Sequence, residues 1–280
     1  MPDADAFLAP GWPAPPTVRA LVTTRRSGHS KAPYDSFNLG MHVGDDPAAV
    51  AANRALLRQR LPAEPCWLEQ VHGIDVALVD GSGRKAPPCG DAAATRIPGA
   101  VCAVMTADCL PVLFCDEAAT VVAAAHAGWR GLAAGVLEAA LVAMATPPAR
   151  IMAWLGPAIG PAAFEVGGEV REACLARDPG AHVAFAAREI RGKWLADLYT
   201  LARRRLTRAG VSRIYGGGRC TFTESARFYS YRRDGVTGRF ASMIWLEDAS
   251  GVRLGASGGS MAMRYPVISV ADGRGVSPLR

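Results

Sequence analysis

Three short apolar runs in the middle of the chain constrain its fold more than any other feature. Residues 101–105 (VCAVM), 110–115 (LPVLFC) and 121–125 (VVAAA) are separated by brief turn-like stretches. Continuous apolar runs of this length, bounded by turn signals, are typical of strands that are buried on both faces. The centre of the chain is therefore predicted to form buried strands.

Helical patterns stand on either side of these runs. Asp46 and Pro47 suit the N-cap and first position of a helix, and an apolar stripe continues to about Arg60. Further helices are predicted over 131–145 and over 197–209, the latter closed by Gly210. Further strands are predicted over 66–80, 151–155, 228–232 and 241–246. Because strands and helices mix without a strict βαβ rhythm, the pattern favours an α/β or α+β fold.

The pattern changes near the C-terminal end of the sequence. Residues 251–280 lose their periodicity and gain glycine and serine, so we expect a catalytic domain over 1–250 and a weakly ordered extension over 251–280. Residues 255–259 (GASGG) match the G-x-S-x-G string of serine hydrolases. No strand is predicted before this string and no helix after it, and the nucleophile elbow needs both. Chance explains the match best.

Charge and composition argue against nucleic-acid and membrane partners. The net charge is +6, and half of this excess lies in residues 251–280. A surface that binds single-stranded nucleic acid combines basic residues with aromatic ones. Aromatic residues are not interleaved with the arginine clusters at 203–205 and 232–233. The long apolar stretch 121–145 contains His126, Arg130 and Glu138, which do not suit a transmembrane helix. The seven cysteines form no C-x-x-C pair and the N-terminus has no signal-peptide pattern, so reduced thiols in the cytoplasm are expected.

His72, Cys109 and His126 are the residues best suited to bind a metal ion. His72 lies where a predicted strand breaks at Gly73, Cys109 lies in a turn between two buried strands, and His126 lies at the end of an apolar strand. One thiolate and two imidazoles suit zinc or copper and leave a fourth position open for water or substrate. Their spacings, 37 and 17 residues, match no compact metal motif. From spacing alone, two structural histidines and a buried thiol are the commoner arrangement.

An ordered set of motifs adds to this interpretation. It comprises TTR at 23–25, NLG at 38–40, VGDDP at 43–47, NR at 53–54, QVHG at 70–73, TADCLP at 106–111, HAGWRG at 126–131, GPAIG at 156–160, and YRRD at 231–234 followed by GR at 238–239. With these motifs, which cover about residues 12–246, the chain resembles the family known as multicopper polyphenol oxidoreductase (laccase) domain, peptidoglycan editing factor or purine nucleoside phosphorylase. The family usually has two glycines after the first arginine, whereas this chain has Arg26, Ser27 and Gly28, so this loop is expected to differ.

The resemblance implies a fold, a metal and an activity. It implies a single-domain, four-layer α/β/β/α sandwich with a zinc site, formerly described as copper, made of His72, Cys109 and His126. It also implies an enzyme that acts on purine nucleosides by phosphorolysis and by adenosine deamination. The expected small-molecule partners are thus a purine nucleoside and phosphate, whereas the oligomeric state is not predicted.

Several residues are candidates for roles in such a reaction. Asp108 and Glu165 are candidates for the carboxylate that moves protons during deamination. Arg25 and Arg130 are candidate phosphate clamps, because a guanidinium binds phosphate bidentately. Asn38 and Gln70 are candidates for hydrogen bonds to sugar or base. Each has a plainer interpretation: ion pairing at the surface for the arginines, and capping or turn stabilisation for the amides.

Three other functions fit parts of the sequence. A single copper at the His-Cys-His triad would allow oxidation of phenols, although five histidines are too few for a blue site plus a trinuclear cluster. Cys109 could instead be a nucleophile with His126 or His72 as its base, which would give a cysteine hydrolase that edits peptidoglycan precursors. A binding module without turnover is the last class. Metal content separates the zinc enzyme from the cysteine hydrolase, because a thiol bound to zinc is not free to attack.

Overall fold

The central apolar runs are strands buried on both faces. In a computed structural model, which describes residues 4–82 and 86–248, they form β5 (Cys102–Thr106), β6 (Leu110–Asp116) and β7 (Val122–Ala127). Alternate residues of β6 enter two different cores: Val112 and Phe114 pack on one side of the sheet, and Leu113 and Cys115 on the other. This double burial explains the unbroken hydrophobic sequence and confirms the predicted strands.

The strands belong to two large sheets. The six-stranded sheet has the order β12-β8-β6-β7-β4-β3 and adds β3 (Val76–Leu78), β4 (Ala92–Thr95), β8 (Ile151–Leu155) and β12 (Arg213–Gly216). The four-stranded sheet has the order β1-β2-β13-β5 and adds β1 (Phe7–Leu8), β2 (Val18–Thr23) and β13 (Phe240–Leu246). The chain crosses from one large sheet to the other between β5 and β6.

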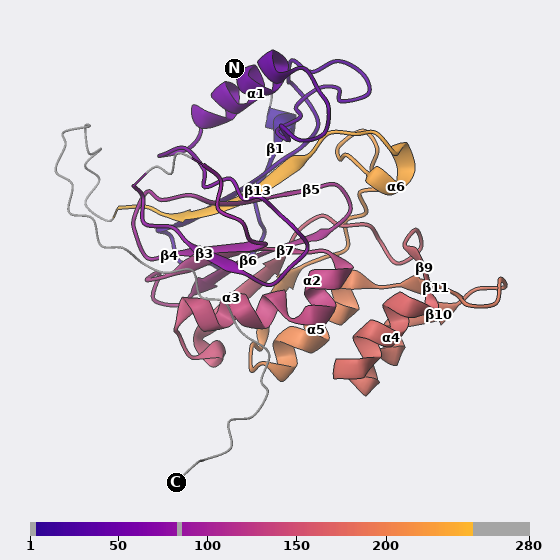
Figure 1. The fold of residues 1–280 in the computed structure, drawn as a ribbon. Coiled ribbons are helices and arrows are strands. Elements are labelled where there is room, and N and C mark those ends of the chain that lie inside the picture. Colours follow the sequence, from indigo (N-terminus) through magenta and orange to yellow (C-terminus); the bar gives the residue numbers. More distant parts are fainter. Residues whose placement is uncertain (1–3, 83–85, 249–280) are drawn as a thin grey trace, which may run out of the picture.

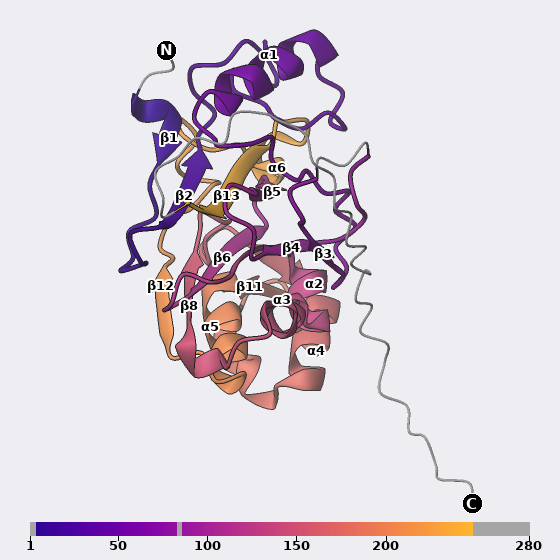
Figure 2. The same ribbon diagram turned by 90° about the vertical axis from the view of Figure 1, so that its left-hand side faces the viewer.

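Helices cover the outer faces of both sheets, as Figures 1 and 2 show. Helix α1 (Pro47–Arg58) packs on the four-stranded sheet, where its Leu57 joins a core with residues of β5 and β13. Helices α2 (Trp129–Ala134), α3 (Val136–Met144), α4 (Gly168–Arg177) and α5 (Leu198–Arg208) lie on the side of the six-stranded sheet. The facing sides of the sheets enclose the middle core. This arrangement confirms the expected α/β/β/α sandwich.

Shorter elements complete the described chain. A three-stranded sheet, β10-β11-β9, is formed by β9 (Glu165–Gly167), β10 (Phe185–Ala187) and β11 (Lys193–Ala196). The remaining short helices are η1 (Ala4–Ala6), η2 (Pro148–Arg150), η3 (Pro179–Ala184) and α6 (Tyr231–Asp234). None of the helices over residues 4–82 and 86–248 is both long and apolar enough to cross a bilayer.

Some sequence-based boundaries are wrong. The helix expected over 131–145 is two helices, because Gly135 adopts a left-handed conformation (φ 112°) between α2 and α3. The strand expected over 66–80 is reduced to β3 and isolated bridges at Cys66 and Glu69. The segment 228–232 is not a strand but leads into α6, which Ser230 caps. The expected extension, residues 251–280, and its GASGG string lie outside the described residues.

Candidate metal centre

Strand register brings Cys109 and His126 together at one edge of the six-stranded sheet. His126 is the penultimate residue of β7, and Cys109 directly precedes β6. The two strands are antiparallel, with Leu110 opposite Ala127 and Pro111 opposite His126. The end of β7 therefore lies beside the start of β6, which places the thiol and the imidazole at the same edge.

His72 completes the cluster from a loop. Its backbone is left-handed (φ 61°), and its ring lies 4.8 Å from the His126 ring, centroid to centroid. Its Nε2 lies 3.8 Å from Cys109 Sγ, and the three ligand atoms all lie within 4.8 Å of one another. Tetrahedral zinc would place such atoms about 3.5 Å apart. The cluster can therefore hold a metal ion after small adjustments of its side chains.

A buried carboxylate, Asp91, orders both histidines. It lies just before β4 and is fully buried. Its oxygens accept hydrogen bonds from the backbone N–H groups of Val71 (3.1 Å), His72 (2.9 Å) and Gly73 (2.6 Å). Its Oδ1 also lies 2.8 Å from His126 Nδ1, which leaves Nε2 of that ring for the metal. Sequence reasoning missed Asp91, whose only signal is an acidic residue directly before a short apolar run.

The thiol and the imidazole stabilise each other's charged forms. Burial raises the pKa of the Cys109 thiol, but the charge of His126 and hydrogen bonds with His126 and His72 lower this pKa to about 6. Burial lowers the pKa of His126, but the Cys109 thiolate and Asp91 raise this pKa to about 9. The thiolate is the form that binds metals. Cys109 is thus prepared to act as a ligand near neutral pH, and metal binding would displace the proton of His126.

Gly128 leaves room for the cluster. A Cβ atom at this position would lie 2.7 Å from His72 Cδ2 and 3.0 Å from Cys109 Sγ. Both distances are too short for non-bonded carbon and sulfur atoms. A side chain on Gly128 would therefore displace two of the three ligands, and the absence of one keeps them close together.

The two carboxylates expected to move protons, Asp108 and Glu165, are not part of the His-Cys-His cluster. Asp108 is 9% exposed, and its oxygens accept hydrogen bonds from Thr221 Oγ1 (2.6 Å) and Arg232 N (2.7 Å). Its carboxylate thus anchors the start of α6 to the loop that carries Cys109. Glu165 lies in β9, where its Oε2 pairs with Arg188 at 3.3 Å.

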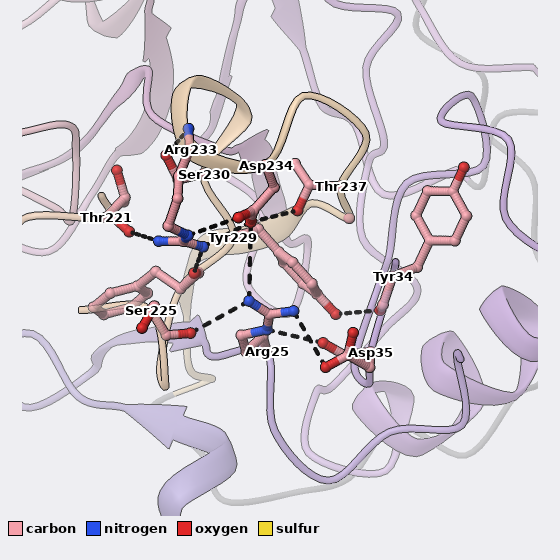
Figure 3. A network of polar contacts seen from close by, with 12 residues as sticks. Arg25, Tyr34, Asp35, Thr221, Ser225, Tyr229, Ser230, Arg233, Asp234 and Thr237 are labelled. Carbon is pink, nitrogen blue, oxygen red and sulfur yellow. Dashed lines mark hydrogen bonds and ion pairs between the residues drawn. The ribbon is translucent and has the colours of Figure 1, made fainter. Parts of the chain in front are cut away.

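Arg25 is engaged within the protein, as Figure 3 shows. It pairs with Asp35 Oδ2 at 3.3 Å and with Asp234 Oδ2 at 4.0 Å. It also donates to the carbonyls of Asp35 and Ser225, and its guanidinium lies over the Tyr229 ring. These contacts tie β2 to the segment around α6, so Arg25 is held by protein partners rather than left open for phosphate.

The other three expected substrate contacts differ in their surroundings. The Asn38 side chain is buried, donates to Gly40 O and Asp45 Oδ2, and accepts from Gly40 N and Arg239 N. Gln70 both donates to and accepts from the backbone of Met105, which fastens the His72 loop to β5. Arg130 is exposed and stacks on Trp129 at 4.4 Å. Across the described residues, it has no carboxylate within ion-pair distance.

Two sheets packed between layers of helices, with a His-Cys-His cluster at one sheet edge, define a candidate metalloprotein of the α/β class. Comparison with known proteins identifies the family within this class. The chain belongs to the family described as multi-copper polyphenol oxidoreductase laccase, whose sequence model matches residues 19–247.

Curated relatives and solved structures support this assignment. Purine nucleoside phosphorylase PA4543 of Pseudomonas aeruginosa is 56% identical over 87% of this chain and 100% of the relative. Purine nucleoside phosphorylase YfiH of Escherichia coli is 57% identical over 86% of this chain and 98% of the relative. The crystal structure of NMB0706 from Neisseria meningitidis matches with a TM-score of 0.83 and 51% identity, over 87% of this chain and 100% of that chain. YlmD from Geobacillus stearothermophilus matches with a TM-score of 0.81 and 34% identity, over 89% and 98% of the two chains.

Proposed function

We propose that this protein is a zinc-dependent purine nucleoside phosphorylase. The observation that carries the proposal is the His72, Cys109 and His126 cluster, which Asp91 orders and Gly128 leaves room for. Three protein ligands are typical of a catalytic zinc site, since structural sites usually have four. The close relatives named purine nucleoside phosphorylase supply the substrate class.

We infer that exposed apolar side chains on segments that carry site residues contact the flat base of a nucleoside. Four large apolar side chains are exposed on segments that also carry site residues: Met41, Val71, Tyr231 and Val236, with exposed fractions of 51%, 52%, 61% and 55%. Val71 precedes His72, and Tyr231 precedes Arg232, whose N–H binds the Asp108 carboxylate. Aromatic and aliphatic side chains pack against the flat faces of a purine base. When bound, zinc would supply a Lewis acid and a water of lowered pKa.

Adenosine deamination is a second activity that we propose for the same site. Here water would attack C6 of the adenine base and ammonia would leave, whereas in phosphorolysis phosphate attacks C1′ of the ribose. A protein group must carry protons between the water and the base. Asp108 and Glu165 are the candidates. Asp108 is adjacent to Cys109 but accepts hydrogen bonds from two donors. The Glu165 side chain is 36% exposed, and its carboxylate has one ion-pair partner among the described residues, Arg188. Replacement of Glu165 by Gln should therefore slow deamination more than phosphorolysis.

Two alternatives have specific support. Thiolate and imidazole ligands also bind copper, and the family description refers to copper oxidation of phenols. The lowered pKa of Cys109 also suits a nucleophile, which favours a cysteine hydrolase in the absence of metal.

None of the described cysteines forms a disulfide, which supports our proposal that the protein works in the reducing cytoplasm.

The test is a joint measurement of metal content and turnover. Untagged wild type, Cys109→Ala and the control Cys174→Ala, which removes a buried thiol of α4, would be assayed for bound zinc and copper. Each would then be incubated with inosine and with adenosine, with and without phosphate. We expect one zinc per chain, with free base and ribose 1-phosphate formed, in all but Cys109→Ala. Bound copper with phenol oxidation would favour the oxidase. No metal, an alkylatable Cys109 and no nucleoside turnover would refute the proposal in favour of the hydrolase.

A further inference from the structure

Arg239 stands beside the metal centre. It directly precedes β13, and the pairing of Phe240 with Thr106 places it next to the loop that leads from β5 to Cys109. Cys109 and Asp108 both lie within electrostatic range of its guanidinium. The antiparallel register and the electrostatic interactions thus place Arg239, at the start of β13 in the four-stranded sheet, near the loop that carries Cys109.

The stem of Arg239 is fixed by the segment around Asn38. The backbone N–H of Arg239 donates to Asn38 Oδ1 (2.8 Å), and its carbonyl accepts from Leu39 N (3.1 Å). A Cβ atom on Gly40 would lie 3.0 Å from Arg239 Cγ and 3.2 Å from Arg239 Cβ. The missing side chain at Gly40 therefore leaves the space that the arginine stem occupies.

The guanidinium of Arg239 has unused donors. Among the described residues, only its Nη1 is hydrogen-bonded, to the carbonyls of Thr237 and Gly238, both at 3.0 Å. Within residues 4–82 and 86–248, no carboxylate lies within ion-pair distance of it, whereas Arg25 and Arg233 have such partners. Burial lowers the pKa of Arg239, and the charges of Cys109 and Asp108 only partly oppose this change. A half-buried cation without an ion pair is costly unless an anion arrives.

A second arginine, Arg54, lies near Arg239, and His42 interacts with both. Burial lowers the pKa of His42, and the charges of Arg239 and Arg54 lower this pKa further, so all three groups lie within electrostatic range. Arg54 is held by two donations to Leu39 O and by stacking on Trp67 at 4.2 Å. Arg54 is thus fixed as a source of positive potential, while Nε and Nη2 of Arg239 have no hydrogen-bond partner in the part of the chain that the structure describes. A planar guanidinium with two free donors matches two oxygens of a tetrahedral oxyanion.

We propose that Arg239 binds the inorganic phosphate that attacks the nucleoside at the metal centre. This inference rests on the proposed phosphorylase activity, and it assigns the phosphate to a residue other than Arg25 and Arg130. In the reaction, an oxygen of hydrogen phosphate forms the bond to ribose C1′. The bond from C1′ to the base nitrogen breaks, and its electron pair stays on the base. The proton of the hydrogen phosphate passes to the base, so that ribose 1-phosphate and the neutral base result.

The test uses metal-loaded wild type, Arg239→Gln, Arg239→Lys and a matched control, Arg96→Gln. Arg96 also donates to backbone carbonyls and has no carboxylate partner among the described residues. It follows β4 at the opposite edge of the six-stranded sheet from the ligands, where Thr95 pairs with Val122. Binding of inorganic phosphate is measured by calorimetry without nucleoside, and bound metal is quantified. KM values for phosphate and nucleoside are then measured separately.

We expect Arg239→Gln to weaken phosphate binding and raise the phosphate KM by about tenfold or more, with metal content and nucleoside KM unchanged. Arg239→Lys should lie between this variant and wild type, and Arg96→Gln should equal wild type. Phosphate binding that depends on Arg239 without nucleoside turnover would support this site while the phosphorylase proposal fails. Turnover with an unchanged phosphate KM in Arg239→Gln would overturn the site and leave the activity standing. If Arg239→Gln loses its metal, the phosphate affinity of Arg239→Lys tests the proposal instead. An affinity equal to that of wild type would then overturn it.

Discussion

At the scale of single residues, the buried carboxylate of Asp91 contacts both histidines of the candidate metal centre. One carboxylate binds three consecutive backbone N–H groups of the His72 loop and the ring of His126. Burial raises the pKa of Asp91, but the hydrogen bond and charge of His126 and the N–H groups of Gly73 and Val71 lower it overall. Asp91 is thus an anion at neutral pH that fixes the backbone of His72 and the ring of His126.

Replacement of Asp91 by Asn should loosen the metal centre. The amide keeps the shape but loses the charge, and its NH₂ group cannot accept all the donors that the carboxylate accepts. We expect metal affinity to fall by about 10- to 100-fold, as for other groups that orient metal ligands. Asp116→Asn is the control, because Asp116 is also buried and accepts from Thr120 N and Val121 N. Competition with a chelator gives both affinities, and equal losses in the two variants would contradict a specific role for Asp91.

The sequence predicts the ligands better than it predicts the groups that position them. Cys109 and His126 were identified because each lies at an end of an apolar run, where a side chain can reach a site. Asp91 and Arg239 also stand at strand ends, but their roles depend on partners 19 and 201 positions away. Contacts over such distances are set by sheet register, which local hydrophobic patterns do not determine. Asn38 and Gln70 were expected to bind substrate, whereas their hydrogen bonds position Arg239 and His72.

At the scale of elements, prediction succeeds where burial is regular. Strands β5, β6, β7, β8 and β13 are apolar because both faces are covered, and α1 has a capping Asp46 and a clear apolar stripe. Helix α4 buries only Val170 and Cys174 fully, so its pattern is weak and the sequence did not predict it. Phe228 and Tyr229 are fully buried in an irregular segment, which suggested a strand that does not form.

An acidic residue fastens α4 to α5, and it gives a prediction about pH. Asp178 is 3% exposed at its side chain and contacts Arg204 Nε (2.8 Å) and Arg208 Nη1 (2.8 Å). Hydrogen bonds from Arg204 hold the pKa of Asp178 below its usual value. A folded-state pKa below the unfolded one stabilises the fold above the unfolded pKa of about 3.9, and this contribution is lost as pH falls through the folded value.

Asp178→Asn should therefore lower the free energy of unfolding at pH 7 and at pH 5, with a smaller difference from wild type near pH 3. Urea unfolding at the three pH values measures this difference. Glu117→Gln is the control, since Glu117 also contacts two arginines, Arg150 and Arg213, but is 41% exposed, and exposed pairs contribute little. A difference that does not shrink at low pH would show that the ion pairs are not the cause.

At the scale of the whole molecule, the cluster of His72, Cys109 and His126 connects the two large sheets. Cys109 lies in the connection between β5 of the four-stranded sheet and β6 of the six-stranded sheet, and His126 lies on β7. The His72 loop is fastened to β5 by Gln70 and to the start of β4 by Asp91. The three ligands come from segments 37 and 17 positions apart in sequence, and they meet only after both sheets have paired. A bound metal ion should therefore stabilise the folded sandwich as a unit.

Removal of the metal should lower the thermal stability of the whole domain. A ligand that binds only the folded state at 100 times its Kd adds about 2.7 kcal/mol to the free energy of unfolding. For a domain of this size, that corresponds to a rise of about 5–10 °C in the unfolding midpoint. Calorimetric scans of metal-loaded and chelator-treated protein measure the change, with Cys174→Ala expected to respond as wild type does and Cys109→Ala expected not to respond. Identical midpoints for the loaded and stripped wild type would mean that the cluster holds no metal strongly enough to couple the two sheets.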